Sequence, residues 1–362
     1  MTKKLRVALL FGGRSAEHDV SLLSAATVYS ALDPNRYDIV PIGVTKTGAW
    51  ILCETRDGAL PQSLPESGAV VACSFGRPGA LFHADVSPGR MEPLSPIDVI
   101  FPVLHGPFGE DGSVQAIAEL MDVAYVGSGV FGSAAAMDKD MAKRLLRESG
   151  LPVADYISVR SGVLIRWDNV KEKLGDLVFV KPSRMGSSIG VGKASDEQSF
   201  SAAVSEAFKH DSKILIEQFV RAREIECGVL QLASGELKVS VPGEIATSSS
   251  YDFYTYEAKY IDAAGATIQV PAVLPTHVEE RLKALSVEAF HALGCEGLAR
   301  VDFFLLQDDR ILVNEINSLP GFTSISMYPK AFAASGMTLP ALVDALIEHA
   351  LGRKRDGCFI QP

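Results

Sequence analysis

The sequence predicts an α/β N-terminal domain with a parallel sheet, followed by two α+β subdomains. Its 362 residues are enough for two or three domains of roughly 100–200 residues each. Residues 5–130 alternate strand-like and helix-like segments, which is typical of a parallel sheet covered by helices. From Asp138 the order changes to strands with only occasional helices, as in α+β folds. We therefore expect three units, at residues 1–137, 138–222 and 223–362.

The N-terminal unit should begin with a strand in RVALLFGG and a helix in AEHDVSLLSAATVYSALD that ends near Pro34. DIVPIGVT and WILC have the composition of strands. Residues 53–95 are rich in Gly, Pro and Ser, which indicates irregular structure with short strands. The unit closes with the strand DVIFPVLHG, the helix SVQAIAELMD and the strand AYVGSG.

The second unit begins with a helix in KDMAKRLLRESG, which ends at Gly150 with Pro152 as a stop signal. Strands in LVFVKPS, GVGKAS and KILIEQFV follow, and the helix SFSAAVSEAFKH separates the last two. In the third unit, residues 224–274 have the pattern of strands interrupted by the polar, aromatic loop TSSSYDFYTYEAKY. Helices are expected at about 276–293 and 338–351.

A hairpin predicted between those two helices carries charges on one face. Its strands are LARVDFFL and ILVNEIN, with Asp308-Asp309 as the turn. If Gln307 and Arg310 close that turn, the opposed pairs are Asp302–Glu315, Arg300–Asn317, Phe304–Val313 and Leu306–Ile311. Like charges directly opposite on a sheet repel each other, so the pairing of Asp302 with Glu315 predicts a cation.

Composition excludes several classes of protein. The net charge of −10 and the pI of about 5.3 argue against a general attraction to nucleic acid or anionic lipid. The apolar run at residues 7–11 is too short for a signal peptide, and no run approaches the ~18–20 residues of a membrane span. The five cysteines form no CxxC pair, so we expect reduced thiols, no zinc site and a cytoplasmic location.

The segment FVKPSRMGSSIGV, residues 179–191, is a candidate phosphate-binding loop. Lys181 ends an apolar strand and precedes small residues, whose backbone N–H groups can approach an anion while the lysine supplies a positive charge. The segment is not the GxxxxGK[ST] loop, which occurs nowhere in the chain. A flexible surface hairpin is the alternative interpretation.

The segment YVGSGVFGSAAAMDK contains GxGxxG at Gly127, Gly129 and Gly132, which has the form of a dinucleotide-binding fingerprint. However, its strand comes late in the sheet, and no clean βαβ unit with a ribose-binding acid follows. We therefore favour glycines that shape a domain junction leading to Lys139. An NAD-dependent oxidoreductase is the alternative.

Two segments end strands at the carboxyl edge of the first sheet, where open α/β sheets bind ligands. In FGGRSAEHDVS, Glu17 either faces a ligand or only favours the helix dipole. In VLHGPFGEDGS, His105 taken alone is more often structural than catalytic. Further along, the segment ILIEQFVRAREIEC is interpreted by default as a solvated acidic edge. Its acidic residues are Glu217, Glu224 and Glu226.

Together these motifs resemble the D-alanine–D-alanine ligase family of the ATP-grasp superfamily. The resemblance runs from FGGRSAEHDVSL through LHGPFGEDGSVQ, AMDK, VKPSRMGSSIGV, REIECGVL, YEAKY and LARVDFF to NEINSLPGFTSISMYP. It spans nearly the whole chain in the family's order, and the ordered set is highly specific. It implies two α+β subdomains of ATP-grasp type, with ATP between them.

The resemblance also implies which residues bind ATP and metal. Those for ATP are Lys139 and Lys181 at the phosphates, Glu217, Phe219 and Val220 at adenine, Glu224 at the ribose, and Lys259. Many relatives have Trp where Phe219 stands, and either aromatic ring can pack on adenine. Two Mg²⁺ ions, with Mn²⁺ as an alternative, would be held by Asp302, Glu315 and Asn317, which would neutralise the opposed carboxylates.

The implied reaction has two steps. The carboxylate of a first D-alanine attacks the γ-phosphate to give an acyl phosphate, and the amine of a second D-alanine then displaces phosphate. The residues implied for the substrates are Glu17 at the first ammonium with His105 nearby, Arg300 and the Gly321 N–H at the tetrahedral oxyanion, and Ser326 with Lys259 at the second carboxylate. Tyr260 would join Ser187 and Glu17 in a hydrogen-bonded latch that closes a loop over the site and excludes water.

Other functions stay open at this point. A different ATP-grasp ligase could use another amino-acid or hydroxy-acid acceptor, although relatives that make D-alanyl-D-lactate depart from Tyr at the position of Tyr260. A non-catalytic nucleotide-binding module is disfavoured, because every matching catalytic position is occupied. We expect small-molecule substrates, no nucleic-acid or membrane partner, a role in peptidoglycan precursor synthesis and, by the resemblance, a homodimer.

Overall fold

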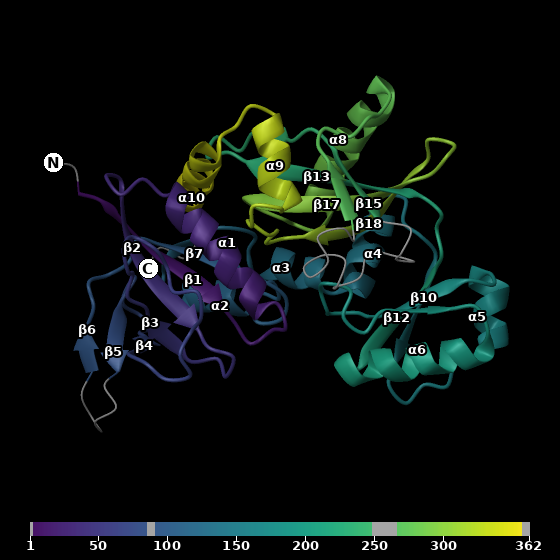
Figure 1. The fold of residues 1–362 in the computed structure, drawn as a ribbon, viewed down its shortest axis with the longest axis horizontal. Coiled ribbons are helices and arrows are strands. Elements are labelled where there is room, and N and C mark those ends of the chain that lie inside the picture. Colours follow the sequence, from purple (N-terminus) through teal and green to yellow (C-terminus); the bar gives the residue numbers. More distant parts are fainter. Residues whose placement is uncertain (1–2, 85–90, 248–265, 357–362) are drawn as a thin grey trace.

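The computed structural model describes residues 3–84, 91–247 and 266–356, which form three β-sheets with covering helices (Figure 1). An eight-stranded sheet is formed by the first part of the chain. A four-stranded and a six-stranded sheet are formed by residues after Asp138, where the sequence pattern changes.

The eight-stranded sheet is half parallel and half antiparallel. Its strands are β1 Leu5–Gly12, β2 Tyr37–Val44, β3 Trp50–Leu52, β4 Val70–Cys73, β5 Leu81–Ala84, β6 Met91–Pro93, β7 Val99–Leu104 and β8 Ala124–Tyr125, in the order β6-β5-β4-β3-β2-β1-β7-β8. The strands β2, β1, β7 and β8 pair in parallel, as predicted, whereas β2 to β6 pair antiparallel. The described part of residues 53–95 contains no helix, and parallel pairing usually needs a helical crossover, so these strands return antiparallel.

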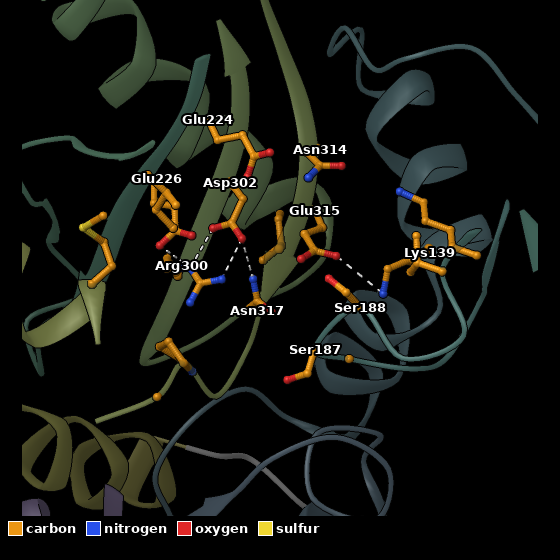
Figure 2. A pocket seen from close by; sticks show the side chains of 18 of the residues that line it. Lys139, Ser187, Ser188, Glu224, Glu226, Arg300, Asp302, Asn314, Glu315 and Asn317 are labelled. Atoms are coloured by element: carbon orange, nitrogen blue, oxygen red, sulfur yellow. Dashed lines mark hydrogen bonds and ion pairs between the residues drawn. The ribbon is translucent and has the colours of Figure 1, made fainter. Parts of the chain in front are cut away.

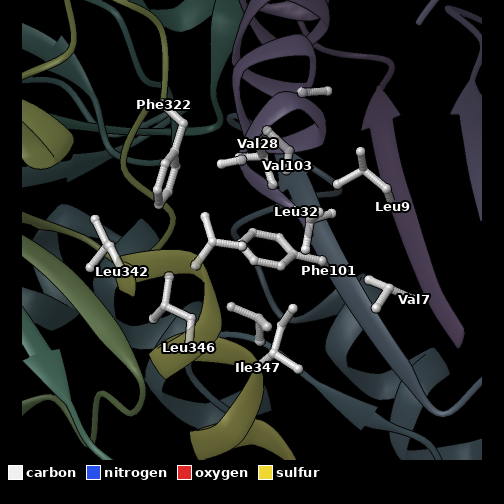
Figure 3. Close-up of a cluster of buried hydrophobic side chains, with 14 of the residues drawn as sticks. Val7, Leu9, Val28, Leu32, Phe101, Val103, Phe322, Leu342, Leu346 and Ile347 are labelled. Carbon is white, nitrogen blue, oxygen red and sulfur yellow. The ribbon is translucent and has the colours of Figure 1, made fainter. Parts of the chain in front are cut away.

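Helices cover both faces of this sheet. Helix α1, His18–Ala31, and helix α10, Leu339–Asp356, pack on one face, and α2, Ser113–Leu120, packs on the other. In Figure 3, Phe101 of β7 lies among apolar side chains of α1 and α10, including Val28 and Leu346. The last helix of the chain therefore completes the core under the first sheet.

The four-stranded sheet is antiparallel and has one apolar face. Its strands are β9 Tyr156–Arg160, β10 Val178–Pro182, β11 Gly192–Ala194 and β12 Lys213–Gln218, in the order β11-β10-β12-β9. Helices α5, Trp167–Leu174, and α6, Glu197–His210, pack on the face that carries Val178 and Val180. Because side chains alternate along a strand, Phe179, Lys181 and Glu217 lie on the opposite face.

The six-stranded sheet is also antiparallel, as the α+β prediction requires. Its strands are β13 Arg223–Gln231, β14 Leu237–Val239, β15 Gly243–Thr247, β16 Ala266–Gln269, β17 Leu298–Leu305 and β18 Ile311–Asn317. Helix α8, Thr276–Ala292, covers the face that carries Ile225, Val301 and Phe303. Helices α3, Val130–Met137, and α4, Lys139–Glu148, pack near β18, and α9, Met327–Ala334, packs on β13. Four of the described elements were not predicted: α3, β9, α5 and α9.

Strands β17 and β18 form the predicted hairpin, and its charged end has the predicted register. Asp302 is opposite Glu315, and Arg300 is opposite Asn317. These four side chains lie on the face that α8 leaves uncovered.

The other end of the hairpin is shifted by one residue from the prediction. The loop has three residues, 307–309, with Asp309 at a φ of 60°, and Leu306 pairs with Arg310. A bulge at Asn314 then restores the predicted register at the charged end. The predicted pairs Phe304–Val313 and Leu306–Ile311 are therefore wrong, and the observed pairs are Phe303–Val313 and Leu305–Ile311.

Gly127, which follows β8, and Gly132, which lies in α3, have a packing role. Gly127 has a φ of 102°, and a Cβ there would lie 3.0 Å from the side chain of Leu319. A Cβ at Gly132 would lie 2.3 Å from the backbone oxygen of Gly294, so α3 contacts the end of α8 backbone to backbone. The GxGxxG spacing is thus explained by a junction between the first and third sheets, which is the interpretation favoured above.

Among the described residues, no single helix has the length and apolar composition needed to cross a membrane. Helices α9 and α10 meet that criterion only jointly, across a bend of 107°.

Candidate active site

A cavity of about 400 Å³ lies between the four-stranded and six-stranded sheets. Its walls are the polar faces that the helices of both sheets leave uncovered, and loops after β1 and β7 of the first sheet line one end. Every predicted site residue in the described part of the chain lines this cavity, namely Glu17, His105, Lys139, Lys181, Ser187, Glu217, Phe219, Val220, Glu224, Arg300, Asp302, Glu315, Asn317, Gly321 and Ser326. Lys259 and Tyr260 lie outside the described residues.

The charged end of the β17–β18 hairpin forms one wall of the cavity (Figure 2). Arg300 donates from Nε and Nη2 to the two carboxylate oxygens of Asp302, each at 2.7 Å. The amide nitrogen of Asn317 donates to the same carboxylate at 3.0 Å. Glu315 lies 3.5 Å from the ammonium of Lys139. Each of the opposed carboxylates therefore has a cationic side chain beside it.

Glu226 on β13 is a site residue to which no role was given from the sequence. Its carboxylate lies 3.0 Å from Nε of Arg300, and the residue is buried. Burial opposes the charge of Arg300, but Asp302 and Glu226 together raise its pKa well above the ordinary value. The default interpretation of a solvated acidic edge is therefore wrong for Glu226, and it is equally wrong for the buried Glu217.

Lys139 connects the hairpin with the candidate phosphate loop. It is the first residue of α4, and its ammonium donates to the backbone oxygen of Met185 at 2.8 Å. Its backbone N–H donates to the backbone oxygen of Ser183 at 2.9 Å. The start of the loop is thus held against α4, which argues against the alternative of a flexible surface hairpin.

Lys181 shares a carboxylate with a lysine that the sequence interpretation missed. One oxygen of Glu217 pairs with Lys181 and the other pairs with Lys143 of α4. The side chains of Lys143 and Glu217 are only 1% and 5% exposed. Lys143 follows Lys139 by four residues, so the two lie on the same side of α4, and that spacing was the available signal.

Aromatic and apolar side chains line the cavity next to Glu217. The ring of Phe219 lies 6.0 Å from that of Phe179 between their centroids, with the planes tilted by 46°. Val220 follows Phe219, and Glu224 lies on β13 across the cavity. A flat ring system could bind here between apolar side chains, with polar groups at its edge.

Glu17 connects the first sheet with the phosphate loop. It is 7% exposed, and the hydroxyl of Ser187 donates to its carboxylate. A Cβ added to Gly106 would lie 2.9 Å from Oε2 of Glu17, and one added to Gly186 would lie 2.8 Å from the same oxygen. These two glycines therefore leave just enough room for the carboxylate of Glu17. Glu17 and Ser187, two members of the predicted latch, are in contact.

The loop after β7 contributes His105 and a second residue that was missed, Glu110. His105 is buried, its Nε2 lies 3.1 Å from the hydroxyl of Ser24, and burial lowers its pKa. Glu110 accepts a hydrogen bond from the backbone N–H of Gly106 at 2.6 Å. Burial, reinforced by the charge of Glu17, raises the pKa of Glu110 to about 8. The GEDG segment that contains Glu110 follows the same strand as His105, but nothing in its spacing shows that this half-buried carboxyl turns toward the cavity.

Gly321 and Ser326 lie in the turn before α9. The hydroxyl of Ser326 accepts from the backbone N–H of Thr323 at 3.0 Å. A Cβ at Gly321 would lie 2.8 Å from that hydroxyl. Ser326 is the residue immediately before α9, so the positive end of the helix dipole also faces this part of the cavity. The arrangement suits a carboxylate.

The oxygen ligands at the hairpin fit a hard divalent cation. Asp302 and Glu315 supply carboxylates, and because the nitrogen of Asn317 donates to Asp302, its amide oxygen is left as a further ligand. Within the described ranges, no group of three or more His, Cys, Asp or Glu side chains could hold a metal ion. The remaining ligands would therefore have to come from a bound anion and from water.

The chain matches known proteins along nearly its whole length. Residues 6–128 match the family model described as "D-ala D-ala ligase N-terminus", and residues 145–348 match "D-ala D-ala ligase C-terminus". The chain is 54% identical over 359 residues to a D-alanine–D-alanine ligase A of Mesorhizobium japonicum, which covers 98% of this chain and 99% of that protein. It is 48% identical over 352 residues to one of Brucella suis, covering 97% and 98%.

Solved structures are similar along the whole chain. The D-alanine–D-alanine ligase of Coxiella burnetii has a TM-score of 0.82 and 32% identity, covering 98% of this chain and 96% of that one. A D-Ala:D-Ser ligase of Enterococcus faecalis has the same TM-score and identity, covering 96% and 100%.

Proposed function

The chain belongs to the D-alanine–D-alanine ligase family, and we propose that its cavity joins two D-alanine molecules to D-alanyl-D-alanine with the use of ATP. This is a reaction of peptidoglycan precursor synthesis. The observation that carries the proposal is the convergence of Lys139, Lys181 and the Arg300–Asp302–Glu315 group on one cavity. The cations suit phosphate groups, and the carboxylates suit the metal that accompanies a nucleotide.

ATP would lie between the two antiparallel sheets. Lys139 and Lys181 would contact its phosphates, and the loop at 183–191 would place backbone N–H groups beside them. The adenine and ribose contacts proposed are Glu217, Phe219, Val220 and Glu224, with Lys259 from outside the described residues. The apolar contact between Phe179 and Phe219 supports the adenine end.

Two Mg²⁺ ions, with Mn²⁺ as the alternative, would be held by Asp302, Glu315 and Asn317. When bound, the metal supplies neutralising charge for the phosphate oxygens during transfer. In the structure described, Arg300 neutralises the carboxylate of Asp302, and Lys139 neutralises that of Glu315.

The first D-alanine would bind at the end of the cavity formed by the first sheet. Its ammonium would pair with Glu17, with His105 nearby, and its carboxylate would face the phosphates. Attack of a carboxylate oxygen on the γ-phosphorus breaks the bond to the β–γ bridging oxygen, so that ADP leaves and an acyl phosphate remains. The contact between Ser187 and Glu17 supports a site that excludes water from this intermediate.

The second D-alanine would bind at the turn before α9. Its carboxylate would accept a hydrogen bond from the hydroxyl of Ser326 and pair with Lys259, and its amine would attack the acyl carbonyl. The new C–N bond forms as the amine loses a proton and the C–O bond to phosphate breaks. Arg300 and the N–H of Gly321 would stabilise the oxyanion. Tyr260 would complete the latch with Ser187 and Glu17.

We further propose that residues 1–137, 138–222 and 223–362 are the three functional units, and that the protein acts as a cytoplasmic homodimer on small-molecule substrates alone. The acidic composition supports the absence of a nucleic-acid partner.

A coupled assay of phosphate release from ATP tests the function. We expect release with D-alanine, together with D-alanyl-D-alanine as the product, and no release with L-alanine. D-serine and D-lactate are included as acceptors, because a D-Ala:D-Ser ligase is among the similar structures. Turnover only with one of those acceptors would overturn the acceptor assignment, and reduction of NAD without ATP use would overturn the ligase assignment.

A further inference from the structure

Lys143 is a buried lysine that does not line the cavity. It lies on α4, and its side chain is 1% exposed. Glu217 and Lys181 do line the cavity, so Lys143 lies behind Glu217 as seen from the proposed nucleotide site. Among the described residues, Glu217 is its only ion-pair partner, and the ring of Tyr156 lies 6.0 Å from its ammonium.

The carboxylate of Glu217 is shared between two ammonium groups. Each of its oxygens pairs with one lysine, Lys143 on the inner side and Lys181 on the cavity side. Burial opposes the charge of Glu217, but the two lysines hold its pKa below the ordinary value. The carboxylate therefore stays ionised although the side chain of Glu217 is only 5% exposed.

A nucleotide in the cavity changes this balance. Its phosphates would attract Lys181, which is the more exposed of the two lysines at 12%. Without Lys143, the departure of Lys181 would leave a buried carboxylate with no cation, which is strongly unfavourable. With Lys143 in place, Glu217 keeps a partner that the ligand cannot reach.

The pair also connects two packed parts of the molecule. Helix α4 packs against β18 and α8 of the six-stranded sheet, whereas Glu217 belongs to β12 of the four-stranded sheet. The Lys143–Glu217 ion pair therefore crosses between the two walls of the cavity behind the proposed adenine end.

We propose that Lys143 is a positioning residue for nucleotide binding, which keeps Glu217 ionised and in place so that Lys181 is available to the nucleotide. This inference depends on the proposed function, because it assigns Lys181 to ATP. Lys143 acts through Glu217 and does not touch the nucleotide.

A double-mutant cycle tests the proposal by calorimetric measurement of ADP binding, with folding checked by circular dichroism. Lys143→Met should weaken ADP binding at least tenfold in the natural background, because Lys181 is then held by Glu217. In the Glu217→Gln background the same change should alter the ADP dissociation constant less than twofold, because no carboxylate remains to hold Lys181. The KM for D-alanine should stay within twofold in the single variant.

Lys171→Met is the matched control, because Lys171 of α5 forms an exposed ion pair with Asp176, and neither residue lines the cavity. It should leave the ADP affinity unchanged. An equal loss from Lys143→Met in both backgrounds, or no loss in the natural one, would overturn the proposal.

If the Lys143→Met variant does not fold, the comparison of Glu217→Gln with the charge-balanced double variant Lys143→Met/Glu217→Gln still tests the proposal. A loss of more than fivefold on adding Lys143→Met to Glu217→Gln would show that Lys143 acts independently of Glu217 and would overturn the proposal. A change of less than twofold supports it. Absence of ADP binding by the unmodified protein would reject the proposed function, and with it this inference. ADP binding that does not depend on Lys143 would reject the inference alone.

Discussion

At the scale of single residues, the charges of the cavity are paired across elements. Asp302 is held by Arg300, Glu315 by Lys139, and Glu217 by Lys181 and Lys143. A ligand must replace these pairs, because a buried charge that loses its partner is strongly destabilised. An anionic nucleotide that pairs with the lysines, together with metal ions that bind the carboxylates, meets this requirement.

The first prediction concerns the proposed metal ligands. Asp302→Asn or Glu315→Gln should lower the rate of ligation ~10²-fold or more, because removing a metal carboxylate costs several kcal/mol of transition-state stabilisation. Initial-rate kinetics at saturating ATP and D-alanine would measure the loss, and circular dichroism would show an unchanged fold. Rates near those of the natural protein would contradict the metal assignment.

The second prediction concerns Glu110 and pH. Its pKa is raised to about 8 from an ordinary value of 4.5, mainly by burial and then by Glu17, while Arg300 opposes the shift. Between those two pH values the unfolded chain releases a proton that the folded protein keeps. The free energy of unfolding therefore falls as pH rises from about 4.5 to about 8.

Glu110→Gln removes this titration and keeps the shape of the side chain. From pH 5 to 8, its free energy of unfolding should fall less steeply than that of the natural protein, by up to ~1.4 kcal/mol per pH unit. Urea unfolding at a series of pH values measures both slopes. His105 is present in both proteins, so the difference between the slopes reports on Glu110, and identical slopes would mean that Glu110 is ionised in the fold.

At the scale of elements, the loop at residues 183–191 is fixed at its start and makes contact further along. Lys213 of β12 donates to both carboxylate oxygens of Asp138 at 2.6 Å, and Ser183 donates to the same group at 2.9 Å. Asp138 in turn caps the start of α4 by accepting from the N–H of Met141. The loop is thus fixed to α4 at one end and reaches the first sheet through Ser187.

The third prediction tests that contact. Gly186→Ala should raise the KM for D-alanine severalfold, because the new Cβ would lie 2.8 Å from Oε2 of Glu17 and separate it from Ser187. Glu17 has little room to move, since Gly106 bounds it on another side. Initial-rate kinetics would measure the change.

Gly68→Ala is the control for this variant. The atom nearest to a Cβ there would belong to Ile51, at an ordinary contact distance of 3.5 Å, and Gly68 does not line the cavity, so the KM for D-alanine should be unchanged. An unchanged KM in Gly186→Ala as well would show that the spacing between loop and Glu17 does not affect the first substrate.

At the scale of the whole molecule, the chain returns at its end to the sheet with which it begins. Leu342 and Leu346 of α10 are buried against Val7, Phe101 and other residues of the first sheet (Figure 3). Arg353 on the same helix donates to the backbone oxygen of Gly127 at 2.8 Å. The stability of the first unit therefore depends on residues more than 300 positions away in the sequence.

The fourth prediction follows from this packing. Leu346→Ala should destabilise the fold by about 2–5 kcal/mol, because it removes buried methyl groups and leaves a cavity in the core of the first sheet. Urea and thermal unfolding would measure the loss. Leu120→Ala on α2, where the side chain is 61% exposed, should change stability by no more than ~0.5 kcal/mol. Equal effects of both substitutions would contradict the role given to α10.

The sequence by itself determined what depends on local backbone geometry. Two-residue spacing placed Glu315 and Asn317 on one face of their strand, and Lys181 was found at the end of an apolar strand that precedes a loop of small residues. The site residues indicated by the ordered motifs all line the cavity, wherever the structure describes them. The shared face of Glu315 and Asn317 follows from the period of a strand, which is the same in any fold, whereas the cavity residues were implied by the resemblance to a known family.

Only the tertiary structure decided the contacts between distant segments. The pairing of Lys143 with Glu217, the hydrogen bond from Gly106 to Glu110 and the return of α10 to the first sheet all depend on which segments pack together. The hairpin register was decided in the same way, because a three-residue loop and a bulge at Asn314 each shift it by one residue and cancel. The physical reason is that periodicity tells which side chains share a face, whereas the partner of that face is chosen by packing among segments far apart in the chain.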